Sequence, residues 1–134
     1  MPHNAFTILM ADDDYEDLEL VENAINNIAP DAAMHKVNNG KAVIDYLEKK
    51  PDNELPCLII LDYNMPELTG SEVLALICKD TRYKAIPKVV LSTSNTPAYK
   101  HECMSNGATE YFVKPDNLPA LKMVARKMLD YCKK

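Results

Sequence analysis

The sequence predicts an α/β protein of one domain, in which parallel strands and helices alternate to form a three-layer sandwich. Five short apolar runs have the length and composition of buried strands. Between them lie segments whose apolar residues recur every three or four positions, as in amphipathic helices. Strands that alternate with helices in this way are parallel and joined by right-handed crossovers, so helices are expected on both faces of a doubly wound sheet.

The first apolar run covers residues 6–11 and leads into an acidic turn. Asp14 in that turn has the side chain of a helix N-cap, and helical spacing then continues to Ile28. Residues 33–37 form a weaker, partly polar strand that suits a sheet edge. The turn at residues 38–40 could signal a hairpin, but the apolar residues after it recur at helical spacing and therefore predict a second helix.

The central strand is the apolar run at residues 57–61, which ends abruptly at Asp62. Leu and Ile dominate this run, so it is expected to be covered by side chains on both faces. The remaining elements are expected as strands over residues 88–92 and 110–113 and as helices over residues 71–79, 97–106 and 117–132.

Composition limits the classes of function. The 134 residues and a hydrophobic content of 47% suit one soluble domain with a real core. The net charge of −5 argues against direct binding of nucleic acid. Seven acidic residues and no basic one lie between Asp12 and Glu22, and this run is expected to form a solvated face. No apolar segment is long enough to span a membrane.

The four cysteines are widely spaced, and no pair has the CxxC spacing of a zinc or redox motif. Cys57 and Cys78 are expected to pack as small buried hydrophobic side chains. This use of cysteine fits a reducing compartment, and the N-terminus resembles no secretion signal, so the sequence predicts a cytoplasmic protein.

Polar side chains follow four of the predicted strands: Asp12 and Asp13, then Asp62, Ser92 and Lys114. The carboxyl ends of parallel strands meet at one edge of a doubly wound sheet, so these groups are expected to lie together. Three crowded carboxylates repel one another, and Mg²⁺ would remove that repulsion. Lys114 and Ser92 suit phosphoryl oxygens, which leaves Asp62 as the nucleophile of covalent phosphoryl chemistry.

Each of these residues also has a purely structural interpretation. The acidic run could be a helix cap with a solvated turn, Ser92 an ordinary hydroxyl at a strand end, and Lys114-Pro115 a polar turn. The placement of all five polar groups at one predicted edge favours the functional interpretation.

With these residues in place, the chain resembles the receiver domains of two-component response regulators over nearly its whole length. The resemblance implies a flavodoxin-like fold with strand order 2-1-3-4-5, and one receiver domain over residues 1–134 with no output domain. It rests on residues 8–13, Leu61-Asp62-Tyr63-Asn64-Met65-Pro66 with Gly70, residues 89–92, Gly107-Ala108 and residues 111–115.

Residues 92–95 are similar to those of stand-alone receivers of the phytochrome-associated type. Thr93 departs from the small residue that usually follows the switch hydroxyl, and its bulk is expected to narrow access to the phosphorylated aspartate.

The resemblance also implies a chemical role for each residue of the acidic group. Asp62 accepts a phosphoryl group from a sensor histidine kinase or a histidine phosphotransfer protein. Asp13, Asp62 and the backbone carbonyl of Asn64 bind Mg²⁺, whereas Asp12 acts through water. Apart from self-phosphorylation and self-dephosphorylation, no enzymatic activity is expected.

The resemblance further implies how the signal leaves the domain. Ser92 and Lys114 hold the phosphoryl oxygens, and Ser92 and Tyr111 form a switch. The expected partners are the phosphodonor, a downstream protein target, and a second copy of the chain bound through the face formed by the fourth helix, fifth strand and fifth helix. Contact with nucleic acid or a membrane is not expected.

Two other functions compete with a signalling switch. A phosphatase of the haloacid dehalogenase class would also use Asp62, but it needs a general-acid Asp two residues later, where this chain has Asn64. A degenerate receiver that only binds partners is disfavoured because the acidic pair, Asp62, Ser92 and Lys114 are all present.

Overall fold

The computed structural model describes residues 6–132 of the chain and contains one parallel sheet with strand order β2-β1-β3-β4-β5. The strands are β1 (Phe6–Ala11), β2 (Ala32–Val37), β3 (Leu58–Leu61), β4 (Lys88–Ser92) and β5 (Glu110–Val113). The helices are α1 (Tyr15–Ile28), α2 (Gly40–Lys49), α3 (Gly70–Ile77), α4 (Pro97–Ser105) and α5 (Leu118–Cys132), with single 3₁₀ turns η1 (Asp52–Glu54) and η2 (Thr81–Tyr83). The predicted fold class and strand order are therefore confirmed.

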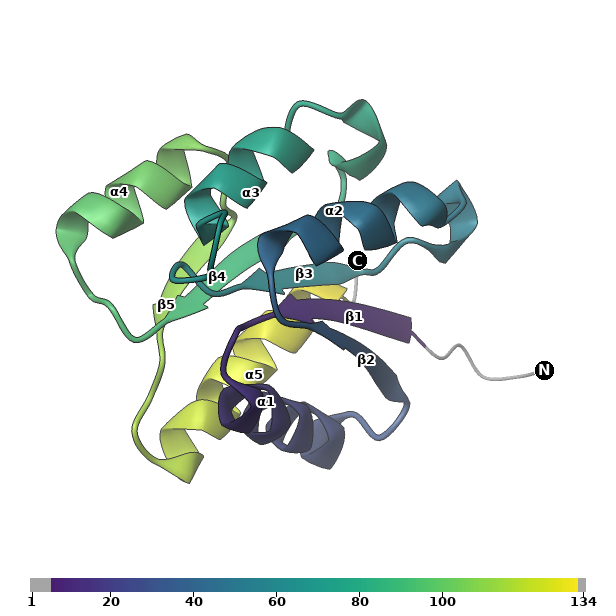
Figure 1. Cartoon of the computed structure of the whole chain (residues 1–134). Coiled ribbons are helices and arrows are strands. Elements are labelled where there is room, and N and C mark those ends of the chain that lie inside the picture. Colours follow the sequence, from purple (N-terminus) through teal and green to yellow (C-terminus); the bar gives the residue numbers. More distant parts are fainter. Residues whose placement is uncertain (1–5, 133–134) are drawn as a thin grey trace.

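The sheet lies between two layers of helices (Figure 1), with α1 and α5 on one face and α2, α3 and α4 on the other. The side chains of β1 alternate between the two layers: Ile8 and Met10 pack with α1 and α5, whereas Leu9 and Ala11 pack on the opposite face. All of β3 is buried. This burial on both faces explains why β3 is a continuous apolar run rather than an alternating one.

Side-chain caps set where the first helices begin. The Asp14 side chain accepts hydrogen bonds from the backbone N–H groups of Glu16 and Asp17, as its place before α1 predicts. Asn39 caps α2 in the same way, which settles the choice between hairpin and helix at residues 38–40. Both caps lie within three residues of a strand end, so each helix begins close to the carboxyl edge of the sheet.

The ends of two later helices also have local causes. Helix α3 ends at Ile77, two residues earlier than expected, and the Asp80 side chain then caps the η2 turn. Helix α4 is followed by Gly107, whose φ of 110° is a left-handed conformation that suits glycine. Within residues 6–132, no helix has the length and hydropathy required to cross a bilayer.

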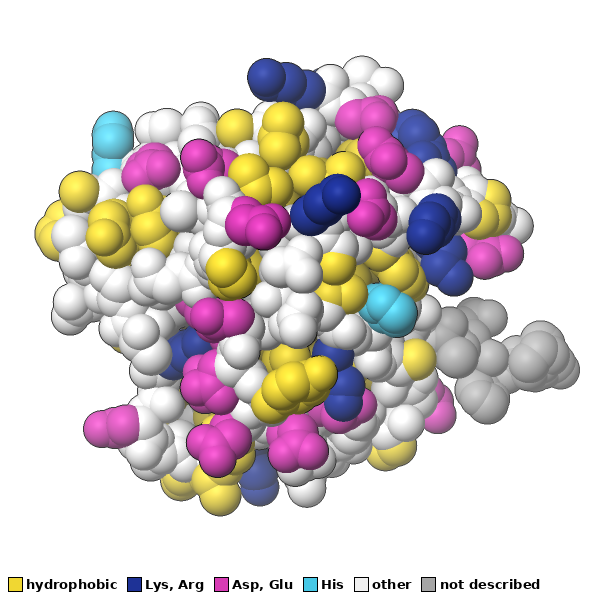
Figure 2. Space-filling view, in the orientation of Figure 1, with side chains coloured by type: hydrophobic (Ala, Val, Ile, Leu, Met, Phe, Trp, Pro, Cys, Tyr) yellow, Lys and Arg dark blue, Asp and Glu magenta, His cyan; other side chains and the backbone are white. Residues whose placement is uncertain are grey.

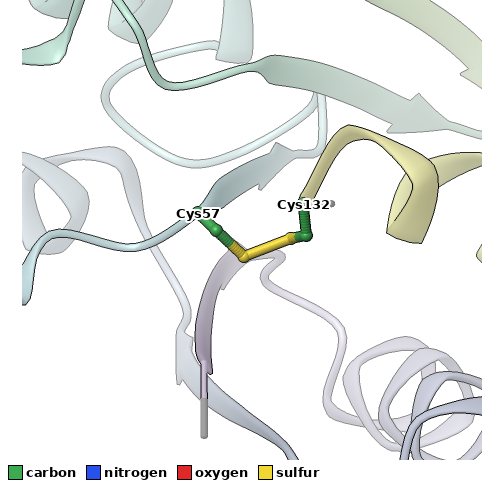
Figure 3. The surroundings of a disulfide bond; sticks show 2 residues. All are labelled: Cys57 and Cys132. Atoms are coloured by element: carbon green, nitrogen blue, oxygen red, sulfur yellow. A yellow bond between two sulfur atoms is a disulfide. The ribbon is translucent and has the colours of Figure 1, made fainter. Parts of the chain in front are cut away.

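A disulfide joins Cys57, just before β3, to Cys132 at the end of α5 (Figure 3). The expectation of a free, buried Cys57 is therefore wrong, and Cys78 is exposed rather than buried. The Cα atoms of the bonded pair lie 5.1 Å apart, a separation that suits a disulfide. The bond anchors the end of α5 to the amino edge of the sheet, and cysteine usage no longer favours a reducing compartment.

Candidate functional site

Four strands deliver the predicted polar residues to the carboxyl edge of the sheet, on the left of Figure 1. Backbone hydrogen bonds continue past the strand ends, from the Asp62 N–H to the Ala11 carbonyl and from the Lys114 N–H to the Ser92 carbonyl. The backbone of these residues is therefore held by the sheet itself, so their side chains start from fixed positions.

The Lys114 ammonium lies at the centre of this group. Its Nζ donates to Asp12 Oδ2 at 2.6 Å and to Asp17 Oδ2 at 2.7 Å, and lies 3.5 Å from Asp62 Oδ2. The lysine side chain is only 10% exposed. Removing an ammonium from water is costly unless acceptors surround it, and the three carboxylates supply them.

Asp12, Asp13 and Asp62 form a compact acidic group whose nearest carboxylate oxygens all lie within 4.8 Å of one another. Asp12 and Asp62 are buried, whereas Asp13 is open to solvent. Hard oxygen donors with one side open to water fit a divalent cation such as Mg²⁺, which keeps several water ligands in proteins. The Asn64 N–H hydrogen-bonds the Asp62 carboxylate from the following loop.

Burial dominates the electrostatics of these carboxyl groups. It raises the pKa of Asp62 to about 6; the nearby Lys114 charge opposes the rise and the Asp12 charge adds to it. Burial also raises the pKa of Asp12, against its hydrogen bonds with Lys114 and the Asp14 N–H. Burial alone would lower the pKa of Lys114, but its bonds to Asp12 and Asp17 outweigh that effect and raise it.

The loop after Asp62 is folded tightly against its own strand. A Cβ at Gly70 would lie 2.4 Å from the Asp62 carbonyl oxygen, so no larger residue fits there without a backbone shift. The Tyr63 ring stacks on Tyr99 of α4, with centroids 4.0 Å apart, and its hydroxyl donates to Glu102. The residue next to Asp62 is thus in direct contact with α4.

The predicted switch residues lie on β4 and β5. Ser92 is fully buried, and its Oγ accepts a hydrogen bond of 3.3 Å from the Ser94 N–H. The Tyr111 ring is also buried, and its hydroxyl donates to the Ser94 carbonyl. The Thr93 side chain, between Ser92 and Ser94 in the sequence, is exposed.

Comparison with known proteins shows which family this chain belongs to. Residues 8–126 match the family model described as the response regulator receiver domain. The chain belongs to this family. The receiver is 30% identical to the probable methanogenesis regulatory protein FilR2 of Methanothrix harundinacea, over 94% of this chain and 83% of that protein. It is 27% identical to the two-component response regulator ARR8 of Arabidopsis thaliana, over 92% of this chain but only 61% of that protein.

Two solved structures extend the similarity. The phosphorylated cyanobacterial phytochrome response regulator RcpA has a TM-score of 0.86 and 29% identity to the receiver, covering 96% of this chain and 94% of that one. The Mn²⁺-bound response regulator Rcp1 has a TM-score of 0.79 and 30% identity, with coverage of 91% and 90%. The expected similarity to phytochrome-associated regulators is confirmed, whereas the haloacid dehalogenase alternative has no support.

The receiver has one site residue that sequence reasoning missed. Asp17 belongs to the acidic run between Asp12 and Glu22, and acidic side chains do gather where Figure 1 places α1 (Figure 2). The expectation that this run is only a solvated face is nevertheless wrong at Asp17, because its carboxylate pairs with Lys114. The available signal was its position: Asp17 lies in the first turn of a helix that begins at the carboxyl edge.

Proposed function

We propose that this receiver accepts a phosphoryl group on Asp62 and changes conformation to control a partner protein. One observation carries the proposal: Asp62 ends the central strand as one of three carboxylates suited to a divalent cation, and the Lys114 ammonium lies 3.5 Å from its Oδ2. An aspartate in this position has the positive charge of Lys114 beside it, and a divalent cation bound by the carboxylates would add a second positive charge. These charges are what an incoming phosphoryl group requires.

In the proposed reaction, an Asp62 carboxylate oxygen attacks the phosphorus atom of a phosphohistidine. The phosphorus–oxygen bond forms as the phosphorus–nitrogen bond breaks, and the electron pair of the broken bond stays on the imidazole nitrogen, which then binds a proton. The attacking carboxylate must be ionised. A pKa of about 6 leaves Asp62 mostly ionised near neutral pH even without a cation.

The neighbouring side chains have distinct proposed roles. Asp13, Asp62 and the Asn64 carbonyl would hold Mg²⁺ directly and Asp12 would hold it through water; the cation would supply charge that neutralises the phosphoryl oxygens. The Lys114 ammonium hydrogen-bonds one of these oxygens.

Ser92 donates its hydroxyl to another phosphoryl oxygen. The movement of Ser92 towards that oxygen would draw in the loop after β4, and Tyr111 would respond to it. The proposed switch is thus the buried pair Ser92 and Tyr111. A hydrogen bond from the Tyr111 hydroxyl to the Ser94 carbonyl already links Tyr111 to the loop after β4.

The proposed phosphodonor is a sensor histidine kinase or a histidine phosphotransfer protein. The proposed output surface is the α4-β5-α5 face, and each of these elements has an exposed apolar side chain: Met104, Val113 and Met123. It would bind a downstream protein or a second copy of the chain. Cytoplasmic location and function without an attached output domain stay predictions.

The test is incubation with acetyl phosphate and Mg²⁺, followed by intact-mass measurement of the parent and of Asp62→Asn. We expect the parent to gain one phosphoryl group only with Mg²⁺ and the variant to gain none. A parent without any gain would refute the proposal. Rapid turnover of a generic phosphomonoester by the parent, abolished in Asp62→Asn, would instead favour the phosphatase alternative.

A further inference from the structure

Lys114 has one carboxylate partner that lies outside the acidic group suited to the cation. That group consists of Asp12, Asp13 and Asp62, whereas Asp17 binds Lys114 from the side of α1. Its bond, at 2.7 Å, is as short as the bond to Asp12 and much shorter than the approach to Asp62. Asp17 is therefore one of the two principal partners of the ammonium.

The position of Asp17 matters most when a cation is bound. A divalent cation draws the negative charge of Asp12, Asp13 and Asp62 towards itself and away from Lys114. Asp17 then remains as the carboxylate that does not share its charge with the metal. An ammonium has three N–H donors, so Lys114 can keep one on Asp17 while another reaches a phosphoryl oxygen.

The backbone around Asp17 is held in place, so its carboxylate offers Lys114 an acceptor at a fixed position. Its N–H takes part in the Asp14 cap, and the residue lies in the first turn of α1. Lysine has a flexible four-carbon stem, and ordering it costs rotamer entropy. An exposed ion pair would contribute little, but the Lys114 side chain is 10% exposed and that of Asp17 is 27% exposed.

We propose that Asp17 is a positioning residue: it holds the Lys114 ammonium at the carboxyl edge so that it meets the phosphoryl group as the group arrives on Asp62. This inference rests on the proposed function, because it assigns Lys114 to the phosphoryl oxygens. Asp17 itself touches neither the phosphoryl group nor the cation and acts only through Lys114.

The test compares the parent with Asp17→Ala, Asp17→Asn and the control Glu16→Gln. Glu16 lies in the same turn of α1 but is exposed, so the control removes the same charge from the same helix end. The rate of phosphorylation by acetyl phosphate is measured at several donor concentrations with saturating Mg²⁺. We expect Asp17→Ala to lower the maximal rate constant roughly tenfold, because a misplaced Lys114 stabilises the transferring group less well.

The concentration dependence separates positioning from a simple charge effect. The donor concentration at half-maximal rate should stay unchanged, which marks an interaction made mainly in the transition state. Asp17→Asn keeps an oxygen acceptor without the charge and should fall between Asp17→Ala and the parent. A faster Asp17→Ala with a lower half-maximal concentration would show that Asp17 only repels the anionic donor, and would overturn the proposal.

A second measurement does not depend on phosphorylation. With saturating Mg²⁺, the Lys114 ammonium of the parent should give a resolved ¹⁵N–¹H signal at low temperature, since its bond to Asp17 shields it from exchange with water. That signal should disappear in Asp17→Ala and persist in Glu16→Gln, while the amide spectra show both variants folded. A signal that persists in Asp17→Ala overturns the inference. Absence of phosphorylation in the parent refutes the proposed function instead, and the Lys114 signal then still decides whether Asp17 holds the ammonium in place.

Discussion

The Tyr111 hydroxyl donates a hydrogen bond of 2.6 Å to the backbone carbonyl of Ser94, two residues beyond Ser92. The same Ser94 gives its N–H to the Ser92 hydroxyl. A movement of the Ser92 side chain therefore reaches the Tyr111 ring through a single residue. In this conformation the Tyr111 ring is already buried.

We predict that Ser92→Ala uncouples the two ends of this connection. Beryllofluoride, a phosphoryl mimic, should shift the NMR signals of Thr93, Tyr111 and α5 in the parent. The variant should still bind the mimic but leave the Tyr111 and α5 signals largely in place, because it lacks the hydroxyl that reaches the mimic. Ser105→Ala, at the exposed end of α4, is the control and should respond as the parent does. An equal response from Ser92→Ala would show that the hydroxyl is not the relay.

The raised pKa of Asp62 predicts how stability depends on pH. The folded-state pKa of about 6 lies above the ordinary value of 3.8, so the folded state binds this proton more tightly than the unfolded state. The contribution of this group to stability is therefore complete below pH 3.8 and is lost as the pH rises to about 6. With metal removed by chelator, Asp62→Asn should unfold with a larger free energy than the parent at pH 7, by up to about 3 kcal/mol.

The measurement is urea unfolding of both proteins between pH 4.5 and 7.5, a range chosen to span the transition. The gain of Asp62→Asn over the parent should grow across this range. Asp116→Asn removes an exposed carboxylate outside the cluster and should show no comparable growth. A gain that stays constant with pH would mean that burial does not raise the pKa of Asp62 in the folded protein.

Removal of single carboxylates should affect Mg²⁺ binding unequally. Both oxygens of Asp12 are engaged, Oδ1 by the Asp14 N–H and Oδ2 by Lys114, whereas Asp13 faces solvent. At ten times its dissociation constant, Mg²⁺ should stabilise the parent by about 1.4 kcal/mol. In thermal melts Asp13→Ala should lose this gain, and Asp12→Ala should keep more of it. Unchanged Mg²⁺ stabilisation in Asp13→Ala would refute its assignment as a direct ligand.

The disulfide should contribute measurably to stability. Cys57 and Cys132 are separated by 75 residues, and closing a loop of this length stabilises a protein by about 4 kcal/mol in the chain-entropy account. Cys132→Ser should therefore melt well below the parent. A reductant should lower the parent to the same temperature and leave the variant unchanged. Cys78→Ser removes an exposed free thiol and serves as the control. If the reductant leaves the melting temperature of the parent unchanged, the disulfide is absent in solution.

Local patterns were enough to predict most of the fold. The strand at Lys88–Ser92 was predicted to the residue, because its apolar run is bounded by Pro87 and a polar loop. The strand-end rule also brought Asp62 and Lys114 together across 52 residues of sequence, since parallel strands share one carboxyl edge. The roles of these residues in phosphorylation stay predictions.

Contacts between side chains that tertiary packing brings together could not be predicted from the sequence. The pairing of Asp17 with Lys114 spans 97 residues, and neither helical periodicity nor the strand-end rule says which acid of α1 a distant lysine selects. The Cys57–Cys132 bond has the same cause, because it depends on where α5 ends relative to the amino edge of β3. The sequence shows all four residues, but it does not predict that the two members of each pair lie in contact.

The central claim is that Asp62 is the phosphoacceptor, and peptide mapping tests it most directly. The parent is incubated with acetyl phosphate and Mg²⁺, digested at acidic pH to preserve the acyl phosphate, and sequenced by tandem mass spectrometry. We predict one phosphoryl group on Asp62 and none on the neighbouring Asp12 or Asp13. A phosphoryl group mapped to another residue, at the same level in the parent and in Asp62→Asn, would contradict the account.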